Sequence, residues 1–590
     1  MLRNHATALF ATLLLTAACG GGTYATGQGS GSQYATGKAD AYGTCETGRA
    51  LDFVNAASTT DETLQNLGAR SRARKNILAH RNGPDGVLGS SDDDLFDSLA
   101  ELDAIPYVGP VTLDAIVAHA LETGAPCVAS STGTVEVVFS PQPWHLSHLA
   151  RVVERIEAAD QTIDVAMYSL SDGTVFQALE DAARRGVSIR LLYEGASEDR
   201  KGPAGTRSAR LEDAGIDVRW INKIMHHKFA IFDGPRRDPA KASTAKVVSG
   251  SGNWSYSAGT KYDENTLFID GNTELTLRLQ AEFDHLWNNS RDLAWNTSLE
   301  TEFGAAVDAE AIAAADTPAV DAAFTSANFR TSISSRYGAT FSVNRGENEI
   351  ADRLVALIEG AQRQILIASG HLRSRPVAEA LIAKHKADPS VEIRVLLDNQ
   401  EYLSVSTHEN QVRDLEACLA GATTDTQTAA CLDRGFLFGY QVHAEGIDVR
   451  FKAYAYRWHY SYAVQMHHKF MVVDGQTLVT GSYNLSDNAE HNTMENMLFF
   501  DVRTYPELVE AYVLNFEQIW NLGRSEGLFA SRMDEIENGT GSRIDIVFEP
   551  MTLDWQQVTD LKGALRDHCS DINDTDFRAH PENHRTCTRN

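Results

Sequence analysis

The residues Met-His-His-Lys-Phe occur twice in the chain, at positions 225–229 and 466–470. In each copy a histidine and a lysine are two positions apart within an apolar, β-like stretch, so both side chains share one face of a strand. A histidine can attack phosphorus or carry a proton, and a lysine supplies a positive charge. We therefore expect two half-sites that converge on one phosphate. The pairs are His226 with Lys228 and His467 with Lys469.

Each pair is followed by the same three signals: an aspartate five positions after the lysine, a Gly-Ser-x-Asn sequence and a Glu-Asn pair. The glycine permits close backbone approach, and the asparagine offers amide donors to an oxyanion. One His-x-Lys on a strand is ordinary, but the whole pattern repeated in the same order indicates a catalytic site. The residues are Asp233, Ser251, Asn253 and Glu264 in the first copy and Asp474, Ser482, Asn484 and Glu495 in the second.

The paired pattern resembles the phospholipase D superfamily, whose HxKxxxxD and GSxxN-type motifs also come in pairs, and the resemblance covers roughly residues 134–525. It implies a phosphodiesterase in which one histidine attacks phosphorus, giving a phosphohistidine, while the other protonates the leaving alcohol. No cofactor and no metal ion are expected. By analogy with related enzymes, we take His226 as the nucleophile and His467 as its partner.

The resemblance also suggests what the other residues do. Glu264 and Glu495 are expected to orient the histidines through the second ring nitrogen, as a carboxylate does in a catalytic triad. Ser251 and Ser482 can hydrogen-bond within the site. Four donors are expected to hold the non-bridging phosphate oxygens, where charge accumulates in the transition state: Lys228, Lys469, Asn253 and Asn484.

Two further pairs are expected to support the fold instead of the chemistry. Asp233 and Asp474 each end a strand and precede a glycine, which favours a turn-stabilising role. The histidines next to the catalytic candidates point to the opposite strand face and are expected to be structural. They are His227 and His468.

The two halves of the chain are internal repeats. The sequence Gly-Ile-Asp-Val-Arg recurs at 215–219 and 446–450, just before each histidine motif. Strands alternating with helices favour an α/β sheet in each half. The expected fold class is two pseudo-twofold-related α/β domains of the phospholipase D type, preceded by a small helical module. The predicted elements are 135–139, 148–159, 162–168, 175–185 and 187–193 in the first half, and 339–343, 349–362, 364–369, 377–386 and 391–397 in the second.

The first residues are typical of an export signal, with an apolar stretch at 8–15 followed by small residues. Residues 16–19, Thr-Ala-Ala-Cys, resemble a bacterial lipoprotein cleavage box in which Cys19 takes the lipid, although Leu15 lies one position too far from it. We expect an exported protein, either lipid-anchored at the cell envelope or secreted. The apolar stretch is too short for a transmembrane helix.

Amino-acid composition indicates the remaining domain boundaries along the chain. A Gly- and Ser-rich tract after Cys19 predicts a flexible tether, and the closing segment is polar. The expected divisions are a signal peptide at 1–18, the tether at 19–48, a helical module at 49–127, the two halves at 134–300 and 335–527, and a C-terminal extension at 528–590.

The helical module resembles a helix-hairpin-helix at residues 102–118, with an apolar face placed at Val111, Ala115 and 117–118. In that family the turn amides can bind a DNA phosphate. The flanking residues here are acidic, so packing or protein docking is the preferred role. An oxygen-rich loop at 82–94 could bind Ca²⁺, but its spacing is not that of an EF-hand, and a solvated acidic turn is preferred.

Seven cysteines occur in the chain, and six remain if Cys19 carries a lipid. An even number in an exported protein suggests disulfides, and no pair has the spacing of zinc ligands. Six cysteines allow fifteen pairings. Proximity in sequence favours Cys45 with Cys127, Cys418 with Cys431, and Cys569 with Cys587.

An aromatic and basic run at 451–462 directly precedes the second histidine motif, after an insertion at about 399–444. Its tyrosines and tryptophan suit a lipid–water interface and could hold a choline headgroup by cation–π attraction. They could equally stack nucleic-acid bases, or pack a strand.

The net charge of −28 repels nucleic-acid phosphates at long range and lowers the expectation of a nuclease. We expect a phospholipase D that hydrolyses or exchanges phospholipid headgroups at a membrane surface, acting as a monomer. An exported endonuclease of the same superfamily and a non-catalytic surface binding module are the alternatives. A cardiolipin-synthase-like transferase is less attractive, because such proteins usually carry membrane-spanning segments.

Overall fold

The computed structural model describes residues 44–90, 92–123, 132–236, 238–293, 320–334, 338–344, 346–433, 437–455, 462–569, 571–572, 574–580 and 583–590. Contacts divide the chain into two compact units, Met1–Gly124 and Ala125–Asn590. Four expectations lie outside the described residues: the signal peptide with Cys19, most of the tether, the Cys45–Cys127 pairing, and the centre of the aromatic run.

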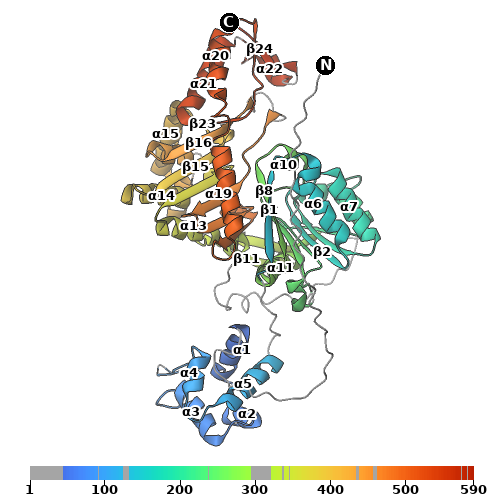
Figure 1. Cartoon of the computed structure of the whole chain (residues 1–590), viewed down its shortest axis with the longest axis vertical. Helices are drawn as coiled ribbons and strands as arrows, with labels where there is room; N and C mark the ends of the chain where they lie inside the picture. The colour runs from blue at the N-terminus through green and yellow to red at the C-terminus, as the bar shows by residue number, and fades with distance from the viewer. Residues whose placement is uncertain are drawn as a thin grey trace, which may run out of the picture. The chain divides into compact units, whose positions relative to one another are not determined.

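The described part of the first unit is helical (Figure 1). Ser98 caps one helix by accepting the backbone N–H of Glu101, and a turn with Tyr107 at φ 73° leads into the next. Leu113 and Ile116 face the core there, but Val111 is 72% exposed. The predicted apolar face is therefore wrong at Val111 and at Ala118, which is also exposed, because the buried residues keep a spacing of three and four that excludes both. The helices are α1 (Thr44–Asn55), α2 (Asp61–Asn66), α3 (Ser71–Arg81), α4 (Leu99–Ala104) and α5 (Pro110–Thr123).

The first half of the second unit contains an eight-stranded sheet in the order β1-β8-β7-β6-β2-β3-β4-β9. Strands β2, β3 and β4 are parallel, and the other neighbours pair antiparallel. Helices α6 (His148–Ala158) and α7 (Gly173–Arg184) pack against this sheet over a buried apolar core. The strands are β1 (Thr134–Ser140), β2 (Thr162–Met167), β3 (Ser188–Tyr193), β4 (Asp217–Trp220), β6 (Lys228–Phe232), β7 (Lys246–Gly250), β8 (Glu264–Asp270) and β9 (Arg291–Asp292).

The second half repeats this order strand for strand, as β10-β21-β18-β17-β13-β15-β16-β23. Helices α13 (Glu349–Gly360) and α14 (Arg375–Ala387) take the places of α6 and α7. The expected α/β fold class with two related halves is confirmed. The strands are β10 (Val320–Phe324), β13 (Gln364–Ser369), β15 (Glu392–Asp398), β16 (Asp448–Ala453), β17 (Lys469–Val473), β18 (Thr477–Gly481), β21 (Asn496–Asp501) and β23 (Met551–Asp554).

The opening strand of the second half is β10, not the predicted segment 339–343. β10 pairs antiparallel with β21 just as β1 pairs with β8. The predicted segment lies in β12 (Gly338–Val343), which forms a separate hairpin with β11 (Phe329–Ser334). The prediction failed because β10 has a weak sequence signal, Val-Asp-Ala-Ala-Phe, whereas β12 has more β-branched and aromatic residues.

A shared apolar core joins the two halves. Helix α11 (Thr273–Asn288) follows β8 of the first sheet but contacts β10 of the second. Helix α19 (Pro506–Trp520) follows β21 of the second sheet but contacts β1 of the first (Figure 1). Each helix brings a stacked aromatic pair into this core. The pairs are Phe283 with Trp287, at 5.6 Å between ring centroids, and Phe516 with Trp520, at 5.4 Å. Burial of four such rings, each contributing about 1.5–3 kcal/mol, fixes the halves against each other.

The segment after residue 527 belongs to the second half and is not a separate polar extension. Its strand β23 pairs with β16, and Ile536, Leu553 and Leu561 are buried in the outer core of that half. The segment is polar on average, so its sequence does not indicate a core. The few apolar residues come to lie on one side only after the helices and the strand have formed. The helices are α20 (Leu528–Asn538) and α21 (Trp555–His568).

Two of the three expected disulfides are confirmed. Cys418 with Cys431 links helices α15 (Val405–Gly421) and α16 (Asp425–Leu432), and Cys569 with Cys587 closes the C-terminal segment. Among the described residues, no helix combines the length and the apolar character needed to cross a membrane.

Candidate active site

Each candidate catalytic histidine lies against the glutamate of the other half. The Nδ1 of His467 hydrogen-bonds with Oε1 of Glu264 at 2.7 Å, and the Nδ1 of His226 lies 2.7 Å from Oε1 of Glu495. The backbone makes the same exchange: the N–H of His226 donates to the carbonyl of Met494, and that of His467 to Asp263. The two repeats therefore form one composite site.

The two lysines lie under the histidines on β6 and β17. The Nζ of Lys228 donates to the carbonyl oxygen of His226 at 2.6 Å, and that of Lys469 to His467 at 2.7 Å. Lys469 also lies 3.1 Å from Nδ1 of His467. Both lysines are almost completely buried, 1% exposed each, so they present a focused positive charge in a low-dielectric environment.

Burial brings the pKa values of the charged residues toward neutrality. It raises the pKa of both Glu264 and Glu495 to about 7, against the opposing charges of Lys469 and Lys228. It lowers the pKa of Lys228 to about 7 and that of Lys469 to about 8. These four groups titrate as one coupled cluster whose charge responds to an entering phosphate.

Both histidines are held neutral in the free enzyme. Burial, followed by the charges of the two lysines, lowers the pKa of His226 well below its usual value. The same causes act on His467, where His371 contributes as well. A positive charge on His467 also lowers the pKa of His226, so the two rings lie close enough to influence each other. A neutral imidazole is the form that can attack phosphorus.

The Gly-Ser-x-Asn segments lie directly against the strands that begin with the glutamates. A Cβ added at Gly250 would lie 2.4 Å from the carbonyl oxygen of Asn265, and one at Gly481 would lie 2.1 Å from that of Asn496. Only glycine allows this approach. The Oδ1 atoms of the two motif asparagines are buried and accept no hydrogen bond from the described residues. These are Asn253 and Asn484.

The motif serines contact the glutamate strands. Ser482 donates to Oε2 of Glu495 at 2.6 Å and accepts the N–H of Asn496. Ser251 accepts the N–H of Asn265 at 2.9 Å, and its hydroxyl also lowers the pKa of Glu264. The serines therefore fix where the glutamate side chains lie.

The second histidine of each motif bonds across the repeats. The ring of His227 lies 3.2 Å from the Asn496 amide oxygen, and that of His468 lies 3.0 Å from the amide nitrogen of Asn265. Glu282 of α11 contacts the other nitrogen of His227 at 3.1 Å. Both histidines are completely buried. They join the two halves and do not line the phosphate site.

Asp233 and Asp474 lie at the far ends of β6 and β17, away from the histidines. Each adopts a positive φ, 49° and 57°, and accepts backbone N–H groups at the start of the neighbouring antiparallel strand, β2 or β13. The donors are residues 160–162 for Asp233 and 362–364 for Asp474. Burial alone would raise the pKa of Asp474, but these N–H groups hold it below its usual value.

Replacing Asp474 with alanine should therefore destabilise the protein without impairing the chemistry. Three N–H groups lose their acceptor, and alanine tolerates the left-handed φ poorly, which costs about 1–2 kcal/mol. Urea unfolding measures this, with turnover per folded molecule as the second readout. Asp474→Asn keeps an acceptor and tolerates the same φ, so it should lose less stability. Loss of turnover at unchanged stability would contradict this assignment.

Several residues in the site carried no recognisable sequence signal. Tyr168 follows β2, and its ring lies 4.6 Å from that of His226. Its counterpart in the second half is Gly370: each donates its backbone N–H to the second histidine of its half. The His467 side chain is accordingly 21% exposed and that of His226 10%. Only alignment of the two repeats by strand reveals this asymmetry.

In each half, a carboxylate accepts the backbone N–H of the methionine that precedes the catalytic histidine. Glu194, after β3, accepts the N–H of Met225 at 2.7 Å, and Asp398, at the end of β15, accepts that of Met466 at 2.9 Å. On the first side, His148 contacts the carbonyl oxygen of Asn253 at 2.9 Å and so positions the phosphate-binding loop. Alignment of the two repeats could have found these carboxylates, because both occur at the ends of equivalent strands, β3 and β15.

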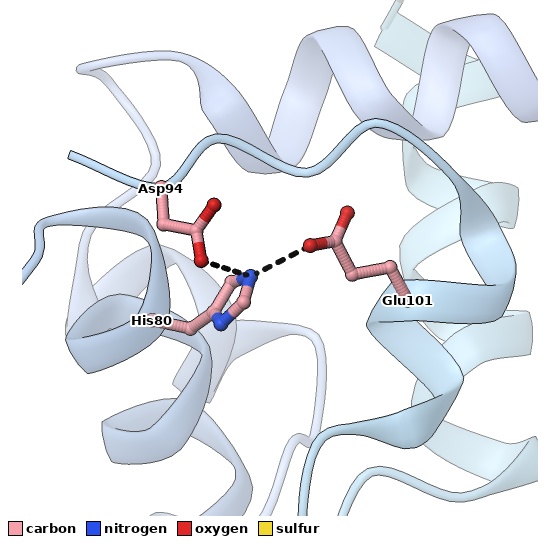
Figure 2. A group of neighbouring side chains, drawn as sticks. All are labelled: His80, Asp94 and Glu101. Atoms are coloured by element: carbon pink, nitrogen blue, oxygen red, sulfur yellow. Dashed lines mark hydrogen bonds and ion pairs between the residues drawn. The ribbon is translucent and has the colours of Figure 1, made fainter.

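Metal-ligand groupings among the described residues lie outside the paired motifs. Figure 2 shows one in the first unit, where Nε2 of His80 lies 3.6 Å from Asp94 and 3.1 Å from Glu101. The other contains Glu212, Asp217 and Asp292. The His80 group links α3 to α4 through the contact of His80 with Glu101. The other oxygen of Glu101 accepts the N–H of Asp97, just before α4 begins.

The loop at 82–94 beside His80 closes on itself. The carboxylates of Asp85, Asp92 and Asp93 accept backbone N–H groups within the loop.

Comparison with known proteins gives the family. The family model described as "cardiolipin synthase, PLD-like domain" matches residues 152–287 and 354–520, more than half of the chain and both halves of the composite site. The chain belongs to the phospholipase D superfamily and is an enzyme of its phosphodiesterase class.

The chain is similar to several characterised relatives over part of its length. The Drosophila melanogaster protein named mitochondrial cardiolipin hydrolase is 30% identical over 186 residues, 28% of this chain and 72% of that protein. A Rickettsia prowazekii phospholipase D is 31% identical over 121 residues, 20% of this chain and 53% of that protein.

Two solved structures are also similar. Nuc, a phospholipase D family member from Salmonella typhimurium, is 27% identical with a TM-score of 0.22, over 27% of this chain and all but 3% of that one. The phosphatidylserine synthase of Haemophilus influenzae is 13% identical with a TM-score of 0.40, over 66% of this chain and 87% of that one.

Proposed function

We propose that the protein is an exported phospholipase D that hydrolyses, or transfers, the headgroup phosphodiester of phospholipids through a phosphohistidine and without a metal ion. The observation that carries the chemistry is the reciprocal contact of each histidine Nδ1 with a glutamate from the other half. A carboxylate at Nδ1 holds the proton there and leaves the lone pair on Nε2. Two such rings in one site are suited to serve as nucleophile and as proton carrier.

In the first step, Nε2 of His226 attacks phosphorus and the bond to the leaving alcohol breaks. His467, which is neutral in the free enzyme, takes up a proton from solvent at Nε2 when the anionic diester binds, and it gives that proton to the leaving oxygen. The asymmetry of the site supports this assignment, because Tyr168 covers His226 whereas the Gly370 side leaves His467 open to alcohol and water. In the second step, neutral His467 takes a proton from water, or from an acceptor alcohol, which attacks phosphorus and releases His226.

The two lysines and the two motif asparagines hold the non-bridging oxygens. An anionic phosphodiester offsets the lysine charges that depress the pKa of His467 in the free enzyme. Substrate binding thus raises the proton affinity of His467 just where the leaving group needs a proton. Fixed donors at the developing charge are the largest expected source of rate acceleration.

Phospholipid is the favoured substrate for two reasons. Similar proteins are named mitochondrial cardiolipin hydrolase and phospholipase D. The net charge of −28 also disfavours long-range attraction of nucleic acid. The endonuclease alternative draws on the helix-hairpin-helix-like turn, yet Asp103 and Asp114 flank that turn. The export signal and lipidation at Cys19 would bring a monomeric enzyme to a membrane surface.

One experiment tests this proposal. Purified mature protein is offered vesicles of phosphatidylcholine or cardiolipin and, separately, single- and double-stranded DNA, each with and without EDTA. We expect headgroup release from lipid, intact DNA, and the same rates with EDTA. DNA cleavage without lipid cleavage would establish the nuclease, and loss of activity with EDTA would contradict a metal-free reaction. Inactivity on every diester would support the non-catalytic alternative.

A further inference from the structure

A large cavity lies in the second half, between the two C-terminal helices and the end of β16. Its volume is about 1070 Å³, at the upper end of the range of roughly 300–1,000 Å³ for small-molecule sites. Buried Leu561 and Leu565 of α21 form part of the lining, together with half-buried Met533 of α20 and Phe548. These four residues form an apolar patch within a lining that also contains polar side chains such as Asn399 and Thr559.

The wall formed by the C-terminal segment is held in place. Strand β23 joins it to β16 through the pairing of Leu553 with Phe451, and the Cys569–Cys587 disulfide closes it. The guanidinium of Arg589 donates to the carbonyl oxygens at residues 535 and 536, both at 2.6 Å. Because the backbone around the cavity is fixed in this way, a ligand would not have to order it.

Hydrogen bonds through one buried carboxylate connect the cavity wall to the His467 half-site. Tyr454, which lines the cavity, donates its hydroxyl to both oxygens of Asp398 at 2.8 and 2.9 Å. The same carboxylate accepts the N–H of Met466, the residue before His467. Two hydrogen bonds thus connect the cavity wall to the residue that precedes the proton carrier.

Charged side chains lie around the apolar patch. Arg566 is 68% exposed and pairs with exposed Asp567, and Nζ of Lys562 lies 4.1 Å from the centroid of the Tyr402 ring. An apolar patch with a charged rim suits an amphipathic ligand whose polar end stays at the surface.

We propose that this cavity takes a hydrocarbon chain of the lipid whose phosphodiester lies at His467. The inference rests on the proposed function and adds to it a requirement for the acyl part of the substrate. The C-terminal segment then determines substrate specificity, selecting long-chain lipid diesters over small water-soluble ones.

Chain-length dependence tests this directly. Dibutanoyl and dihexanoyl phosphatidylcholine are used below their critical micelle concentrations, so that no interface forms, with bis(p-nitrophenyl) phosphate as a chain-free reference. Each buried methylene should raise kcat/KM about fourfold, so two on one chain give about 16-fold between the lipids. Met533→Arg should reduce this ratio to below about threefold. Met533→Leu should preserve it, and so should Leu514→Arg, which places the same charge at an exposed apolar site on α19 outside the cavity.

A second variant tests the cavity in case Met533→Arg fails to fold. Thr407→Trp lies on the exposed side of α15 and fills the cavity from its edge without disturbing the buried interior, so it should also reduce the ratio. Cleavage of both lipids with a ratio that neither variant changes would overturn the cavity assignment alone. Turnover of bis(p-nitrophenyl) phosphate without cleavage of any phospholipid would overturn the proposed function, and the cavity assignment with it.

Discussion

His226→Asn should lower turnover of every phosphodiester by at least about 10³-fold, because asparagine cannot form the covalent intermediate. His467→Asn should lower phospholipid turnover by about 10²–10⁴-fold, the usual contribution of a general acid. The two variants should differ on bis(p-nitrophenyl) phosphate, whose leaving group needs no proton. There His467→Asn should release one p-nitrophenolate per active site in a burst and then stall, while His226→Asn releases none. Rapid-mixing absorbance measures the burst.

The intermediate and the control make this result decisive. The stalled His467→Asn enzyme should carry an acid-labile p-nitrophenyl phosphoryl group on His226, which intact-protein mass spectrometry would detect. His385→Asn, in the last turn of α14, is the matched control and should behave as wild type. A burst from His226→Asn but not from His467→Asn would reverse the two roles. Full steady-state activity in either variant would end the two-histidine mechanism.

Repetition in the sequence predicted the fold class because each copy carries the same strand and helix periodicity. The predicted strand 364–369 coincides with β13, and the predicted helix 148–159 differs from α6 by one residue. Repetition also placed the two half-sites in one protein. The repetition did not show which glutamate contacts which histidine, because neither motif indicates whether this contact lies within one repeat or between the two.

The errors have a common physical cause. Strand β10 lacks β-branched residues apart from its first, so its pairing with β21 at the sheet edge defines it more than its own sequence does. β23 is separated from its partner β16 by about a hundred residues, and its polar surroundings conceal Leu553. Tyr168 joins the site only because β2 ends next to the histidine motif. Long-range pairings of this kind are decided by tertiary contacts and not by local pattern.

Replacing each glutamate with glutamine should have the same effect as replacing the histidine that it contacts in the other repeat. Glu495 contacts His226 and Glu264 contacts His467, so each substitution should impair the ring of the other repeat. Each should lower phospholipid turnover by about 10²-fold or more, because an amide can present the wrong hydrogen-bonding group to Nδ1. On bis(p-nitrophenyl) phosphate, Glu264→Gln should keep a fast burst, like His467→Asn. Glu495→Gln should lose the burst, like His226→Asn. The opposite assignment would place each contact within its own repeat.

The pH profile supplies a readout that mere loss of packing would not change. Because burial raises the pKa of Glu264 and Glu495 to about 7, kcat/KM should fall as the pH drops through 7 and the carboxylates take up protons. Lys228 and Lys469, with pKa values of about 7 and about 8, should cause a second fall as the pH rises and they lose their charges. The wild-type profile should therefore be a narrow bell with its maximum near pH 7. A glutamine does not titrate, so either variant should shift the acid limb, and because each carboxylate raises the pKa of both lysines, it should also move the alkaline limb to lower pH. An acid limb that survives unchanged in both variants would show that neither glutamate controls the histidines.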